Sequence, residues 1–248
     1  MKKGIYMLMA VVALLNVCQA KAQDMQRFIV NVGDFTHLLV EDHVNVVYEC
    51  NPDSTGFARY YAKPELARQI VFTNNKKGKL SISIGSDSIY AHTVPTVVVY
   101  SAYLQTAENQ GDSTLTVKSV ATAPHIKFKL MNNGTLMVEN VEATTVEAEV
   151  LTGKGRLEIH GKCNDFEAKN TGKADIYAEG LVAKNVSCRI LGTGRVYCYI
   201  NGGKLSLKGS GTGKVYYRGV PAEMKSFQLG SIKAISLDQT QPKNEEVK

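Results

Sequence analysis

Apolar and polar residues alternate over short stretches throughout the second half of the chain. The stretch from Ile126 to Leu130, for example, has apolar residues at its first, third and fifth positions and lysines between them. Alternation with a period of two residues predicts a β-strand that buries one face and leaves the other in water. Strands of this kind are predicted to begin at Ile126, Val146, Phe166, Val186, Leu205 and Phe227.

A second short strand accompanies each of these, and the two recur together. Glycine-rich turn words introduce the second strand at aligned positions 113, 134, 155, 174, 194 and 213, which are 21, 21, 19, 20 and 19 residues apart. A single rung cannot bury its apolar face alone, so such rungs stack and share a core. The repeat predicts an all-β fold, a β-solenoid of about six repeats, built as a parallel β-helix with the usual right-handed crossover. An antiparallel sandwich is the alternative, but it does not require the same kind of residue in each repeat.

Stacking turns aligned positions into columns along the solenoid. Two columns predicted to point inward are Leu136/Leu157/Ile176/Val196/Val215 and Val138/Ile159/Ala178/Cys198/Tyr217, and a predicted corner column is Val141/Cys163/Leu181/Ile200/Val220. Glycine is expected at the corners, where the backbone often needs a positive φ angle. The inward placement of Cys163, Cys188 and Cys198 favours buried free thiols, while Cys50 lies outside the repeats and the pairing of the four cysteines stays open.

The N-terminal third lacks the repeat but still has strand-like segments separated by turn words such as Asn51–Gly56. We therefore expect a β-rich N-terminal lobe over residues 23–104, the solenoid over residues 105–238, and a polar, disordered tail over residues 239–248.

The first 22 residues have the features of a secretory signal peptide. Lys2 and Lys3 precede a mostly apolar run from Ile5 to Val17, and Ala20-Lys21-Ala22 follows it. Cleavage is predicted after Ala22, with Ala20 as the alternative. A lipoprotein is not expected, because Val17 precedes Cys18 where a lipidation signal has a small residue. The sequence thus predicts export to the periplasm, the outer surface or the medium.

Charge and composition exclude some functions. The chain has 29 basic and 23 acidic residues, for a net charge of +6. Loss of Lys2, Lys3 and Lys21 with the signal peptide lowers this to about +3, which is too small to predict nucleic-acid binding. No later stretch is long and apolar enough to predict a membrane span.

The sequence shows no catalytic motif. The histidines, His37, His43, His92, His125 and His160, lack zinc-site spacing, so neither a metal nor a cofactor is expected. Enzymes that process acidic polysaccharides on β-helices use clustered carboxylates. Here Glu147 and Glu167 share one outward column with Glu149 beside it, but the next rungs place serine, arginine and lysine there, as in a mixed charged ladder. Catalysis is therefore unsupported, and a polysaccharide-processing enzyme remains the rival hypothesis.

One outward column is unusual because it repeats tyrosine. Tyr177, Tyr197 and Tyr216 are spaced by 20 and 19 residues and should stack on one face about 4.8 Å apart. Tyr199 follows on the same strand face, and Arg195 and Lys214 line the adjacent edge. Exposed aromatic rings pack against sugars or aromatic partners, and basic groups add charge-assisted hydrogen bonds. These six residues are the predicted ligand-binding site, and a purely structural ladder is the alternative.

Several short motifs occur in a characteristic order: Phe35, Val44–Tyr48, Leu80-Ser81-Ile82, Val94–Tyr100, Gly209–Gly213 and Tyr217–Pro221. Together they resemble the putative auto-transporter adhesin, head GIN domain, a bacterial family with no assigned biochemical function. The resemblance covers nearly all of residues 27–238. It implies an exported, all-β, solenoid-like protein that could be presented at the bacterial surface, and it supplies no catalytic residues to carry over. Several family turns read Gly-Ser-Gly, whereas Thr152–Gly155 and the following turns here do not, so no function tied to a row of turn serines is expected.

These observations favour an exported, non-catalytic, adhesin-like envelope protein that binds a glycan or a surface protein along the solenoid face. The alternatives are the polysaccharide-processing enzyme and a purely structural spacer. The oligomeric state and the identity of the ligand stay open.

Overall fold

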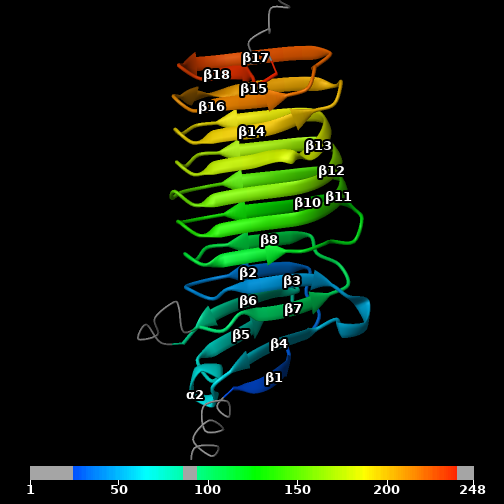
Figure 1. Ribbon diagram of the computed structural model, residues 1–248, viewed down its shortest axis with the longest axis vertical. Helices are drawn as coiled ribbons and strands as arrows, with labels where there is room; N and C mark the ends of the chain where they lie inside the picture. Colours follow the sequence, from blue (N-terminus) through cyan, green and yellow to red (C-terminus); the bar gives the residue numbers. More distant parts are fainter. Residues whose placement is uncertain (1–24, 86–93, 239–248) are drawn as a thin grey trace, which may run out of the picture.

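The computed structural model describes residues 25–85 and 94–238. The predicted signal peptide with Cys18, His92 and the predicted disordered tail lie outside these residues. Within them the strands form one 18-stranded sheet that coils into stacked rungs along the long axis of the molecule (Figure 1).

The first part of the described chain, residues 25–117, contains nine strands and two short helical turns. They are β1 (Gln26–Asn31), β2 (His37–Val40), β3 (Val46–Cys50), η1 (Pro52–Ser54), β4 (Phe57–Ala62), α2 (Pro64–Ala67), β5 (Ile70–Asn74), β6 (Lys79–Ile84), β7 (Val97–Ser101), β8 (Thr106–Asn109) and β9 (Thr114–Val117). No helix in the described part of the chain is long and apolar enough to cross a membrane.

The remaining strands build the solenoid. They are β10 (Ala123–Leu130), β11 (Thr135–Val150), β12 (Arg156–Asn170), β13 (Asp175–Ile190), β14 (Arg195–Ile200), β15 (Lys204–Gly211), β16 (Lys214–Arg218), β17 (Glu223–Gly230) and β18 (Lys233–Ser236). The long strands β11, β12 and β13 each pass a corner, where the register shifts, and so contribute to both strand positions of a rung.

Parallel pairing confirms the predicted solenoid and its main inward column. Leu136 pairs with Leu157, which pairs with Ile176, and Val196 and Val215 continue the column. All five side chains are fully buried. In the second predicted column the first four side chains are fully buried and Tyr217 is half-buried. The handedness of the coil stays a prediction.

The predicted corner column is wrong. Val141 pairs with Gly161, and Gly161 pairs with Leu181 on the next rung. Cys163 lies in a different column, because it pairs with Ala143 and Ala183. Two residues of β11 bridge the corner between paired positions where β12 uses one, so counting from the straight strands does not carry the register around the bend.

The predicted start of the last rung is wrong for the same reason. Met224, not Phe227, pairs with Leu205. Val220, predicted to belong to the corner column, is 80% exposed. The chain between β16 and β17 thus uses a corner of a different length from the earlier rungs.

The parallel stack crosses the boundary predicted near residue 104. Strand β2 pairs in parallel with both β6 and β8, and β3 pairs in parallel with both β7 and β9. The β2/β3 rung therefore lies between two rungs that come later in the chain. Three pairings are antiparallel: β1 with β4, β4 with β7, and β5 with β6. Strands β1, β4 and β5 form the end of the molecule beyond the parallel stack (Figure 1). The division into a lobe and a solenoid stays a prediction.

The turn glycines are needed chiefly because successive turns lie so close together. A Cβ atom on Gly155 would come within 2.2 Å of the carbonyl oxygen of Gly134, and one on Gly194 would come equally close, 2.2 Å, to that of Ala174. Neither glycine has a positive φ angle, unlike Gly153 at +84°. The expectation that corner glycines supply positive φ therefore applies to only some of them.

Two buried asparagines hold the turns in place, a feature that sequence analysis did not find. Asn109 donates to the carbonyl oxygens of Ser113 and Thr135 and accepts from the backbone of Gly111. Asn170 makes the matching bonds to Ala174 and Gly172. The only sequence signal is Asn-x-Gly at the end of the strand. These side chains satisfy backbone groups that would otherwise be buried without a partner.

The four cysteines among the described residues are free thiols. Cys188 and Cys198 are buried as predicted, whereas Cys163 and Cys50 are half-buried. Burial, and secondarily the neighbouring Asp165, raises the pKa of Cys163 to about 12, so this thiol stays protonated at neutral pH.

Replacement of Gly155 by alanine should destabilise the protein by about 2 kcal/mol or more, because the new Cβ would force two turns apart. Gly85→Ala is the matched control, since its Cβ would lie 3.4 Å from a Val71 methyl group, an ordinary contact. Urea denaturation followed by circular dichroism measures both. Equal midpoints for the two variants would show that the turns do not limit the rung spacing.

Candidate functional site

The three predicted tyrosines form a continuous ring stack. Tyr177, Tyr197 and Tyr216 are paired in register on β13, β14 and β16. The ring centroids of Tyr177 and Tyr197 are 5.0 Å apart with planes 2° from parallel, and those of Tyr197 and Tyr216 are 4.9 Å apart at 11°. This spacing follows the separation of hydrogen-bonded strands, which is about 4.8 Å.

The stacking decides which part of each ring a ligand can meet. Adjacent ring faces cover one another, so the surface of the stack consists of ring edges and hydroxyl groups. The Tyr177 hydroxyl donates to Asp175 Oδ2 at 3.3 Å. Among the described residues, no protein group hydrogen-bonds the hydroxyl of Tyr197 or Tyr216. Two phenol groups are therefore available to an external partner.

An arginine that sequence analysis did not single out closes one end of the stack. The Arg156 guanidinium lies 3.7 Å from the centroid of the Tyr177 ring, within cation–π distance. It also donates to Glu158, with Nε 2.9 Å from Oε2, and His160 contacts the other oxygen of Glu158. The register could have located it, because Arg156 is the partner of Asp175 one rung away.

Arg195 is held by a carboxylate. Its Nε and Nη2 atoms donate to Asp175 Oδ2 at 3.0 and 2.7 Å, and its backbone amide donates to Oδ1 at 2.8 Å. The guanidinium carbon lies 5.9 Å from the Tyr197 ring centroid. Asp175 thus fixes Arg195 beside the tyrosines while half of the Arg195 side chain, 50%, remains exposed.

Lys214 and Tyr199 extend this surface in two directions. Lys214 pairs with Arg195 on one side and Lys233 on the other, which places three cationic residues along one edge. Tyr199 pairs with Arg218 and is not part of the ring stack. Arg218 Nε donates to Glu179 Oε1 at 3.2 Å. We call the surface made by the six predicted residues together with Arg156 the tyrosine face.

The acidic residues of the other outward face are engaged with lysines. Glu147 Oε1 lies 2.6 Å from Lys169 Nζ and 3.2 Å from Lys127 Nζ, each on an adjacent rung. Glu108 is held in the same way by Lys129, at 2.9 Å, and by Gln110. This is the mixed charged ladder predicted from the sequence. Among the described residues, no group of three or more histidine, cysteine or acidic side chains is arranged to hold a metal ion.

Burial by itself would raise the pKa of Glu147, but hydrogen bonds from Lys169 and Lys127 outweigh burial and hold that pKa below its usual value. The pKa of Glu108 is lowered in the same manner. A carboxyl group with a depressed pKa in the folded state stabilises the fold above its usual pKa and loses that contribution as the pH falls through the folded value.

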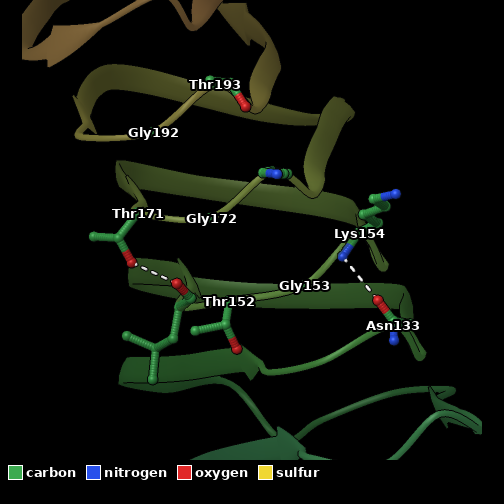
Figure 2. Close-up of a pocket in the computed structure, with 10 residues that line it drawn as sticks. Asn133, Thr152, Gly153, Lys154, Thr171, Gly172, Gly192 and Thr193 are labelled. Carbon is green, nitrogen blue, oxygen red and sulfur yellow. Dashed lines mark hydrogen bonds between the residues drawn. The ribbon is translucent and has the colours of Figure 1, made fainter.

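A hollow of about 450 Å³ lies along the stacked turns (Figure 2). The Lys154 backbone amide donates to Asn133 Oδ1 at 3.1 Å, and the Thr171 hydroxyl donates to the Leu151 carbonyl oxygen at 2.8 Å. These polar groups link one turn to the next, and the remaining lining is mostly glycine and threonine. The hollow is a gap between turns and brings no predicted site residues together.

Loss of the middle ring should weaken the fold. Tyr197→Ala removes two stacking contacts, each worth about 0.5–1.5 kcal/mol. It should therefore cost about 1–3 kcal/mol more than Tyr199→Ala, because the half-buried Tyr199 ring stacks on no other ring within the described residues. Urea denaturation measures the difference. An equal loss in both variants would mean that stacking adds nothing beyond burial.

Acidification should reveal the contribution of Glu147. Glu147→Gln should cost about 1–3 kcal/mol at pH 7, because two lysines lose their charged partner. This cost should disappear as the pH falls through the lowered pKa that Glu147 has in the folded protein. Glu167→Gln is the control, since Glu167 lies one rung along the same column and its contact with Lys169 is 3.9 Å. Denaturation midpoints from pH 7 to pH 3 test this, and a pH-independent difference would contradict it.

Comparison with known proteins places the fold. The structure is similar to a putative adhesin from Bacteroides fragilis, with a TM-score of 0.74, 14% sequence identity, and coverage of 87% of this chain and 98% of that one. It is also similar to a putative lipid binding protein from Parabacteroides distasonis, with a TM-score of 0.65, 16% identity, and coverage of 86% and 98%. For a putative adhesin from Parabacteroides distasonis, the TM-score is 0.66 and the sequence identity is 16%, with coverage of 87% of this chain and 98% of that one.

At these identities the likeness concerns the fold alone. No curated protein matches the sequence. The family model for the putative auto-transporter adhesin, head GIN domain, matches residues 34–221, which is most of the chain and includes Tyr177, Tyr197 and Tyr216. The chain therefore belongs to the putative auto-transporter adhesin, head GIN domain family.

Proposed function

We propose that the protein is exported to the cell envelope, acts without catalysis, and binds a glycan along the tyrosine face. The family and the solved relatives called adhesins support an adhesin-like role. The basic, apolar and small-residue segments of residues 1–22 support export.

One observation carries the glycan proposal. The Tyr197 and Tyr216 hydroxyls lie on a stiff stack, side by side on adjacent rungs, and no described protein group occupies them. Hydroxyl groups both donate and accept hydrogen bonds, which matches the mixed donor and acceptor groups of a sugar. Arg195, fixed by Asp175, and Lys214 supply further donors on the adjacent edge.

The geometry favours this function over a polysaccharide-processing enzyme. A glycosidase needs a carboxyl pair that faces its substrate. Glu147 and Glu108 are instead enclosed by lysines, and Asp175 and Glu158 are bound by arginines. A protein partner and a structural spacer are distinguished from the glycan proposal by experiment.

The triple variant Tyr177→Phe/Tyr197→Phe/Tyr216→Phe tests the proposal, because it keeps the ring stack and removes the hydroxyl groups. Hydrogen bonds worth about 1 kcal/mol each predict a loss of glycan affinity of about tenfold or more. Screening on a glycan array selects the ligand, and titration calorimetry with that glycan measures the loss. Tyr61→Phe, an exposed tyrosine in the N-terminal third, is the control.

An unchanged thermal melting temperature would show that the triple variant keeps its fold. Undiminished binding by that variant would overturn the proposed site. An array on which the wild-type protein binds nothing would overturn glycan binding and favour a protein partner or a spacer.

A further inference from the structure

A second hollow is lined by residues of β1, η1, β4 and β7. Figure 1 shows β1, β4 and β7 in the lower part of the molecule, well below the rungs of β13, β14 and β16 that carry the tyrosine face. The hollow has a volume of about 300 Å³, at the lower end of the range for small-ligand sites. It is lined by Arg27, Ile29, Asp53, Ser54, Phe57, Arg59 and Tyr100.

Strand register brings these side chains together. Ile29 pairs with Arg59, and Arg59 pairs with Val98 on β7. Arg27 lies two residues before Ile29 and so takes a diagonal position to Arg59, about 7–8 Å away between backbones. Ile29 is 57% exposed and Phe57 is 40% exposed, although outward strand positions are ordinarily polar. This face therefore combines uncovered apolar surface with two guanidinium groups.

Unlike the arginines on and beside the tyrosine face, Arg27 and Arg59 are without an acidic partner in the part of the chain that the structure describes. Among the described residues, no carboxylate lies within 4 Å of Arg27 or Arg59, whereas Arg156, Arg195 and Arg218 are each paired with an acid. Arg59 is held 5.6 Å from the centroid of the Tyr100 ring. Like charges at neighbouring positions repel, and an anion between them would relieve that repulsion. Asp53 also lines the hollow and leaves it with one excess positive charge.

The polar rim is preorganised. Asn51 caps η1 by accepting from the backbone amides of Asp53 and Ser54 at 3.0 and 3.2 Å. The turn is tied to β7, because Asn51 donates to Ser101 and Gly56 donates to Tyr100 through their backbones. The backbone of Asp53 and Ser54 is thus held at the edge of the hollow, and both residues, whose side chains carry hydrogen-bond acceptors, line it.

We infer that this hollow binds a carboxylate-bearing sugar at the end of a glycan. Arg27 and Arg59 receive the carboxylate, Asp53 and Ser54 accept from sugar hydroxyls, and Phe57 and Ile29 pack against the apolar face of the ring. A fatty acid would leave Asp53 against hydrocarbon, and a neutral sugar would leave both guanidinium groups unpaired. The site is separate from the tyrosine face and does not depend on its function.

Titration calorimetry with sialyllactose and with a glucuronate-containing disaccharide tests this site, with lactose as the neutral probe. At least one acidic probe should bind saturably, and the choice between them identifies the sugar. Arg27→Gln/Arg59→Gln should weaken that binding by about tenfold or more, because charge-assisted hydrogen bonds are lost. Arg27→Gln alone should also weaken it and leaves the Arg59–Tyr100 contact in place. Arg68→Gln, which removes an arginine outside the hollow, is the matched control.

The triple tyrosine-to-phenylalanine variant of the tyrosine face should bind the acidic probe as the wild type does, which separates the two sites. The inference is overturned if lactose binds as tightly as both acidic probes, or if neither acidic probe binds at millimolar concentration. It is equally overturned if Arg27→Gln leaves binding unchanged in a folded protein, or if Arg68→Gln weakens binding as much.

Discussion

The distance between hydrogen-bonded parallel strands, about 4.8 Å, determines how the stacked rungs of this molecule are arranged. Each residue along a straight strand lies next to its counterpart in the neighbouring rung. The side chains of a column must therefore fit together at that distance. The constraint excludes a Cβ at Gly155 and Gly194, stacks the rings of Tyr177, Tyr197 and Tyr216, and brings Glu147 between two lysines. Core, turns and surface ladders are consequences of one repeat distance.

Along straight strands the regular rung spacing produces a regular repeat in the sequence, whereas at the corners it does not. The column from Leu136 to Val215 was predictable because residues of successive rungs pair one to one along the straight strands. At the corners the number of residues varies from rung to rung, which separated Cys163 from Val141 and exposed Val220. The insertion of the β2/β3 rung between later rungs was also unpredictable, because it is a long-range pairing without a repeat to reveal it.

The candidate site shows the same division. The tyrosine stack follows from the repeat spacing, and so does the position of Lys214 beside Arg195. The contact of Arg156 with the Tyr177 ring depends on a side-chain conformation, which spacing does not determine. The stack also changes what the tyrosines offer: rings that cover one another leave hydroxyl groups and edges for a ligand, where the sequence had suggested flat faces.

Polar or charged side chains that the stacking of rungs leaves without a hydrogen-bond or ion-pair partner are the best candidates for ligand binding. A stacked column that serves only the fold can pair each charge with an opposite charge on the next rung, as Lys127, Glu147 and Lys169 do. The Tyr197 and Tyr216 hydroxyls and the Arg27 and Arg59 guanidinium groups have no such partner among the described residues. The two guanidinium groups enter no ion pair within the described part of the chain, and two like charges in one hollow oppose stability. Binding an external ligand gives a physical reason for such groups, and it applies to both sites.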